Sequence, residues 1–120
     1  MTSIEKAKKI IEIADAKKGF DIELIEIADL TSITDYFVIC SANSDNQVKA
    51  IADEIEFKMK NDNKLSPSHI EGYNTATWIL LDYNDVIVHI FNKESRMFYS
   101  LEKLWEDAKH IDISELIKEN

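Results

Sequence analysis

The reactive side chains of this sequence are three histidines, one cysteine and scattered carboxylates. His69, His89 and His110 lie far apart, with no cysteine partner and no HExxH spacing, so the sequence predicts neither a metal site nor another cofactor. Cys40 lies in the run YFVICSA (36–42), which is apolar on both faces and therefore predicts a central strand, and no histidine or basic residue is nearby in sequence. This setting favours a buried structural thiol over a nucleophile.

His89 and Asp82 could meet across a predicted hairpin. They lie in the apolar runs 86–91 and 78–83, which flank a turn signal at Asn84. If the runs form a β-hairpin, the imidazole and the carboxylate can hydrogen-bond across it. No nucleophile accompanies them, so a structural or interface pair is favoured over a catalytic dyad.

Ser44 begins a predicted helix after a predicted strand, a layout that nucleotidyltransferases share. Those enzymes also need a Gly-Ser turn and an Asp-x-Asp pair to hold metal. Here the glycine is missing, and Asp45 and Asp53 are too far apart to form that pair. A small nucleotidyltransferase-like, nucleotide-binding enzyme that uses Ser44 with Asp82 or Asp35 stays as the alternative function.

The spacing of apolar residues predicts the elements that hold these groups. Apolar residues three and four apart predict helices, and alternating or continuous apolar runs predict strands. The helices are expected over 1–19, 44–61 and 94–105, and the strands over 21–28, 36–42, 69–71, 78–83 and 86–91. Thr2 with Glu5 and Ser44 with Gln47 have capping-box spacing. In the helix over 94–105, the apolar stripe consists of Met97, Phe98, Leu101, Leu104 and Trp105.

This order of elements predicts an α/β (α+β) fold, in which helices flank a mixed five-stranded sheet. Residues 1–108 are expected to form the domain. Residues 109–120 are expected to form a polar tail that frays, in which Ser114 could cap a last turn through Ile117.

The charge balance restricts the class of partner. The 120 residues hold 23 acidic and 14 basic side chains, for a net charge of −9. A protein that grips nucleic acid by its phosphates needs a basic face, so direct nucleic-acid binding as the main contact is not expected. A basic partner is favoured instead.

The location is expected to be the cytoplasm. No apolar run approaches the roughly 20 residues that span a bilayer, so no membrane association is expected. The N-terminus carries charges where a signal peptide has its apolar segment. The lone cysteine fits a reducing compartment.

Aromatic residues gather between His69 and Trp105, a stretch that holds both tryptophans and three of the four tyrosines. This is more than one hairpin and one helix usually bury. Some of these side chains belong to a core, and the others could form a docking patch, because Trp and Tyr are good anchors at interfaces.

Four ordered blocks carry a family resemblance. They are DYFVICSANSDNQVKAIADEI (35–55), HIEGY (69–73), WILLDYNDVIVHIF (78–91) and RMFYSLEKLWEDA (96–108). At these blocks the chain resembles the ribosomal silencing factors, also called RsfS or Iojap-like proteins, over about residues 4–108. Two segments depart from the usual family sequence: residues 41–45, and the turn at Asn84, where the family often has glycine. Because Asn also tolerates a positive φ, the turn is expected to survive.

The resemblance implies a function without catalysis. Such proteins have a nucleotidyltransferase-like fold whose active site is lost. They bind the large ribosomal subunit through its basic protein number fourteen and sterically block the small subunit, which lowers translation when nutrients are scarce. The free proteins are often homodimers.

On this basis we expect a contact surface in the aromatic region. Tyr99 and Trp105 would be apolar anchors, and Asp82 would meet a lysine or arginine of the partner. The full expected set is Trp78, Asp82, His89, Phe91, Arg96, Tyr99, Leu101 and Trp105.

Overall fold

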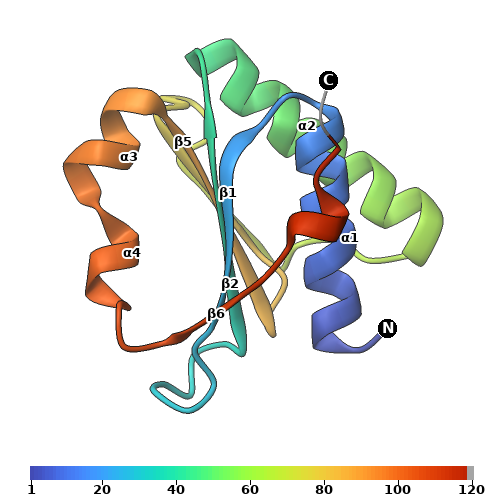
Figure 1. Cartoon of the computed structure of the whole chain (residues 1–120). Coiled ribbons are helices and arrows are strands. Elements are labelled where there is room, and N and C mark those ends of the chain that lie inside the picture. Colours follow the sequence, from blue (N-terminus) through green and yellow to red (C-terminus); the bar gives the residue numbers. More distant parts are fainter. Residues whose placement is uncertain (119–120) are drawn as a thin grey trace.

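A computed structural model describes residues 1–118, which form one mixed sheet with helices on both faces (Figure 1). The predicted α/β architecture is therefore confirmed, except that the sheet has six strands instead of five, in the order β3-β4-β5-β2-β1-β6. The elements in chain order are α1 (Ser3–Ala16), β1 (Phe20–Glu26), β2 (Tyr36–Ala42), α2 (Asp45–Asn63), β3 (His69–Glu71), β4 (Trp78–Asp82), β5 (Val86–Asn92), α3 (Lys93–Tyr99), α4 (Leu101–Leu104), β6 (Lys109–Ile111) and the 3-10 helix η1 (Ser114–Leu116).

The sheet separates two helical layers. Helices α1 and α2 cover one face and α3 and α4 the other, as Figure 1 shows. Strands β2 and β5 pair in parallel at the centre, and all other described pairs are antiparallel. Because side chains alternate along a strand, Val38 and Cys40 join the core under α1 and α2, whereas Phe37 and Ile39 join the core under α3 and α4. The continuous apolar run of β2 therefore serves two cores, as predicted for a central strand.

The N-terminal caps follow the predicted spacing to different extents. At α1, Glu5 N–H donates to Thr2 Oγ1 (3.2 Å) and Thr2 N–H donates to Glu5 Oε1 (2.8 Å), so this capping box is confirmed. At α2, Gln47 N–H donates to Ser44 Oγ (3.1 Å). The Gln47 Oε1 atom, however, accepts from Asn43 N–H instead of Ser44 N–H. Only half of the second box is therefore present.

The turn between β4 and β5 needs a left-handed residue, and Asn84 supplies it with a φ of 75°. Valine at this position should lower the free energy of unfolding by about 1–2 kcal/mol, because a β-branched side chain is strained at positive φ. Glycine should change it by less than about 1 kcal/mol, since the relief of strain offsets the lost hydrogen bond from Ser68 Oγ to Asn84 Oδ1. Urea denaturation of both variants measures the difference, and equal stabilities would contradict this account.

The predicted helix over 94–105 is wrong as a single helix. It breaks at Ser100, which has a φ of 45° and separates α3 from α4. The Ser100 N–H donates to Arg96 O, and its Oγ donates to Met97 O at 2.7 Å. The serine satisfies the end of α3 by itself, so a polar residue stops a helix that the apolar spacing continues. The predicted stripe is divided by the break: Leu101 is buried, whereas Met97, Phe98 and Leu104 are exposed.

The expectation that the C-terminal segment frays is wrong for its described part. Residues 109–111 form β6, the sixth strand, which pairs with β1 through Leu24↔Ile111 and Glu26↔Lys109. Helix η1 follows, and its segment packs on the α1 side of the core through Ile113, Leu116 and Ile117. A three-residue edge strand is too short to show a period, so sequence spacing could not reveal it.

Residues 119–120, the end of the predicted tail, lie outside the described residues, and a domain boundary after residue 108 stays a prediction. Among residues 1–118, no helix is both long and apolar enough to cross a membrane.

Candidate docking surface

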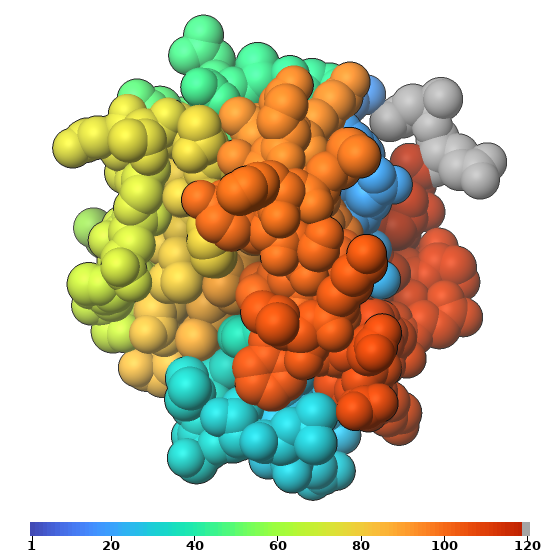
Figure 2. All heavy atoms as spheres, turned by 90° about the vertical axis from the view of Figure 1, so that its left-hand side faces the viewer, coloured from blue at the N-terminus to red at the C-terminus, as the bar shows by residue number. Residues whose placement is uncertain are grey.

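Large apolar side chains lie in solvent on α3 and α4. The exposed fractions are 80% for Met97, 76% for Phe98, 50% for Tyr99 and 74% for Leu104. We call these four, together with the half-buried Trp78, Leu80 and Trp105 beside them, the α3–α4 surface. Figure 2 shows this side of the molecule, with α3 and α4 in orange across its middle. Exposed apolar clusters of this kind mark interaction sites in folded proteins.

A series of aromatic rings connects this surface to the core. The ring centroids of Phe98 and Tyr99 are 5.0 Å apart, those of Tyr99 and Trp78 are 4.8 Å apart, and those of Trp78 and Phe91 are also 4.8 Å apart. Exposure falls along the series from the solvent-facing Phe98 to the fully buried Phe91. Offset and edge contacts of this type stabilise each ring in place. Tyr99 is therefore an exposed anchor on a rigid base.

The structure brings the eight expected contact residues into one region, but only part of them reach its surface. Tyr99 is exposed, and Trp78, Asp82 and Trp105 are half-buried. The side chains of the other four lie beneath the α3–α4 surface and are largely buried: Phe91, His89, Leu101 and Arg96. The expected set left out Met97, Phe98 and Leu104, because helical spacing placed them on one apolar stripe without showing whether that stripe is buried. The excess of apolar residues in so short a segment was the available signal.

The hydrogen bond expected between His89 and Asp82 does not form. The register of the hairpin places His89 opposite Leu80, and Asp82 opposite Ile87. The His89 Nδ1 atom instead accepts from Trp78 Nε1–H at 3.1 Å, and the imidazole meets the edge of another aromatic ring, with the His89 and Phe37 centroids 4.7 Å apart. His89 thus orients Trp78 from below, as a structural group.

Burial of the imidazole lowers the pKa of His89 from 6.5 to about 4. As the pH falls from about 6.5 to about 4, the unfolded chain therefore takes up a proton that the folded chain excludes. The contribution of His89 to the free energy of unfolding should fall over this window by up to about 3 kcal/mol and then level off. His89→Gln keeps an acceptor for Trp78 but does not titrate. Urea denaturation between pH 4 and 7.5 should show a larger loss for the wild type than for the variant, and parallel pH profiles would contradict the prediction.

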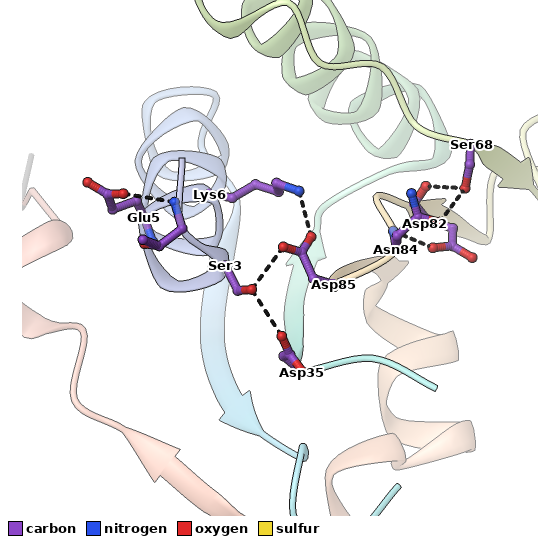
Figure 3. Close-up of polar contacts among 9 residues, drawn as sticks. Ser3, Glu5, Lys6, Asp35, Ser68, Asp82, Asn84 and Asp85 are labelled. Atoms are coloured by element: carbon purple, nitrogen blue, oxygen red, sulfur yellow. Dashed lines mark hydrogen bonds and ion pairs between the residues drawn. The ribbon is translucent and has the colours of Figure 1, made fainter. Parts of the chain in front are cut away.

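The residues expected for the alternative, nucleotidyltransferase-like function are not brought together in one site. Ser44 follows the carboxyl end of β2, whereas Asp35 precedes its amino end, so the seven-residue strand separates them by roughly 20 Å or more. Asp35 and Asp85 both accept from Ser3 Oγ (3.0 and 2.8 Å), and Asp85 also pairs with Lys6, as Figure 3 shows. These carboxylates tie α1 to the sheet. Within residues 1–118, no three His, Cys, Asp or Glu side chains are grouped so that they could hold a metal ion.

Cys40 and Asp82 also have contacts that fit a structural role. The thiol is fully buried, and burial raises the pKa of Cys40 to about 12, which confirms the predicted inert cysteine. The carboxylate of Asp82 accepts from Asn84 N–H at 2.8 Å and so also serves the turn.

Exposed carboxylates border the α3–α4 surface. Glu94 lies on α3, and Glu106 and Asp107 follow Trp105 at the end of α4. On the other side, Glu71 and Gly72 line a hollow of about 370 Å³ together with Trp78 and Leu80. Two exposed lysines, Lys93 and Lys103, also lie on these helices. The local balance is acidic, in the same sense as the whole chain. The apolar centre and the acidic border of the α3–α4 surface together suit a partner with a basic, partly apolar face.

Comparison with known proteins identifies relatives over the whole chain. The family model described as "Ribosomal silencing factor during starvation" matches residues 1–120. Ribosomal silencing factor RsfS of Bacillus subtilis is 42% identical over an alignment of 110 residues that covers 88% of this chain and 92% of that protein. The RsfS of Halalkalibacterium halodurans is 36% identical over 117 residues, covering 98% of this chain and 99% of the relative.

The fold is shared with a solved relative. A crystal structure from Chromobacterium violaceum superposes with a TM-score of 0.84 at 32% identity and covers 88% of each chain. The relatives are named as silencing factors and not as enzymes. The resemblance read from the four sequence blocks is confirmed, and the chain belongs to the ribosomal silencing factor family.

Proposed function

We propose that this protein binds the large ribosomal subunit through its basic protein number fourteen and thereby blocks the small subunit, which represses translation under nutrient limitation. The observation that carries the proposal is the exposed apolar α3–α4 surface with its acidic border. Family membership supports a ribosomal partner. The net charge of −9 favours a basic ribosomal protein over the ribosomal RNA around it.

Steric exclusion requires only a firm contact in the right place. A standard interface takes about 800 Å² from each partner. The surface of this chain is 6753 Å², so most of it would remain outside such an interface. The body, about 34 × 34 × 30 Å, would then stand between the two subunits.

In this proposal the anchors are Tyr99 and Trp105, as expected from the sequence, joined by Met97, Phe98 and Leu104. Asp82, at the rim, would meet a lysine or arginine of the partner. The buried members of the expected set would act from below, because Phe91 and His89 support Trp78.

Co-sedimentation with purified large subunits, with small subunits as the control, tests the binding. Gradient analysis of mixed subunits then tests the block, and saturating protein should reduce the joined ribosomes. Phe57→Ala is a matched control, because Phe57 is 60% exposed but lies on α2, on the opposite side of the sheet. Joining that stays unchanged at saturating protein would refute the proposal.

The free protein is further proposed to be a homodimer in the cytoplasm. The exposed apolar side chains on α3 and α4 could be buried against a second copy of the chain, which favours dimer formation. Sedimentation velocity measures the state: the expected mass is twice the 13.8 kDa of one chain, and the mass of a single chain at micromolar concentration would contradict it.

A further inference from the structure

Arg96 points inward instead of toward a partner. Its side chain is only 11% exposed. The Nε–H group donates to Glu102 Oε2 at 2.8 Å, and Nη1 donates to Ser41 Oγ at 2.9 Å. The Nη2 atom lies 2.8 Å from Glu102 Oε2 and 3.4 Å from Glu23 Oε2. Two carboxylates already neutralise this guanidinium, so little of its charge is available to a partner.

The partners of Arg96 come from separate elements. Ser41 is on β2, Glu23 on β1 and Glu102 on α4, while Arg96 itself is on α3. The main-chain carbonyl of Arg96 also accepts the N–H of Ser100, the residue at which the two helices separate. One side chain therefore spans the break between α3 and α4 and ties both helices to the sheet.

Apart from Arg96, helix α3 is attached to the rest of the protein mainly through the ring of Tyr99, whose centroid lies 4.8 Å from that of Trp78. None of its residues is buried, and its three largest apolar side chains, Met97, Phe98 and Tyr99, are exposed. Helix α4 contributes one buried residue, Leu101. An amphipathic helix is normally held by its buried apolar face, which α3 lacks.

We infer that Arg96 is a positioning residue, whose guanidinium holds α3 and α4 at a fixed angle so that the α3–α4 surface is prearranged for its partner. The inference rests on the proposed function of that surface. Prearrangement strengthens binding because the ordering cost is met before contact. Only a planar fork with several donors can serve the hydroxyl and both carboxylates together, and a lysine ammonium cannot reproduce that geometry.

Arg96→Lys tests the inference, since it keeps the charge and removes the fork. Amide hydrogen exchange should become faster across residues 93–105 and stay unchanged in α1 and α2. Affinity for purified large subunits should fall roughly tenfold, on the scale of interface residues whose loss matters. Glu102→Gln should weaken binding in the same direction, and the double variant should lose less than the two single losses combined, since both break one contact.

Lys6→Met is the matched control. The Lys6 side chain is also 11% exposed and pairs with Asp85, but it lies on α1, on the other side of the sheet (Figure 3). It should lower the melting temperature while leaving the affinity of the folded protein unchanged. An affinity loss equal to that of Arg96→Lys would overturn the inference, because general destabilisation would then explain both variants.

The outcomes separate this inference from the proposed function. If Tyr99→Ala weakens binding and Arg96→Lys does not, the positioning role is overturned and the proposed function stands. If wild-type protein does not bind large subunits, the proposed function fails. Hydrogen exchange then still decides the structural role: faster exchange over 93–105 supports it, and unchanged exchange overturns it.

Discussion

Tyr99→Ala is expected to weaken binding to large ribosomal subunits by about 2 kcal/mol or more, roughly 30-fold, while the protein stays folded. Tyr99 is half exposed, and its ring lies on Trp78, with centroids 4.8 Å apart. The ring is thus oriented before contact and free to bury its outer face against a partner. Its removal should lower the free energy of unfolding by less than about 1 kcal/mol, because half of the ring contacts only water.

Co-sedimentation at several protein concentrations measures this loss, and urea denaturation measures the stability. Phe57→Ala removes an exposed aromatic ring of similar size on α2 and should bind like wild type. If Tyr99→Ala folds normally and binds as tightly as wild type, the α3–α4 surface is misassigned.

Phe91→Ala is expected to lower the free energy of unfolding by about 3–5 kcal/mol. Phe91 is fully buried on central strand β5, beneath α3 and α4. Its ring stacks on Trp78, with centroids 4.8 Å apart, and its neighbours on the sheet cannot collapse into the cavity without breaking strand pairing.

Phe98→Ala is the matched comparison, because it deletes the same ring from a site that is mostly in solvent. It should change the free energy of unfolding by about 0.5 kcal/mol or less. Urea denaturation of the two variants, followed by tryptophan fluorescence, measures both. Similar losses for Phe91 and Phe98 would contradict the division into a buried base and an exposed surface.

Local patterns were sufficient where one short segment determines the outcome. The apolar run of β2 indicated a strand buried on both faces, and Val38 and Phe37 do enter opposite cores. The spacing of Thr2 and Glu5 predicted a cap that both hydrogen bonds complete. Asn84 was expected to accept positive φ, and it does. Each of these outcomes depends on residues close together in the sequence, so it can be predicted from the local pattern.

The sequence by itself determined the α/β class, the central strand β2, the inert cysteine and the family, because periodicity, caps and motif blocks are local. Only the tertiary structure decided the break at Ser100 and the pairing of β6 with β1. It also decided the hairpin register that separates His89 from Asp82, and the inward orientation of the Arg96 side chain. These depend on contacts between segments far apart in the chain. Helical spacing placed Phe98 on an apolar helix face, but within residues 1–118 no element covers that face and Phe98 is exposed, because burial depends on the assembled layers and not on the segment alone.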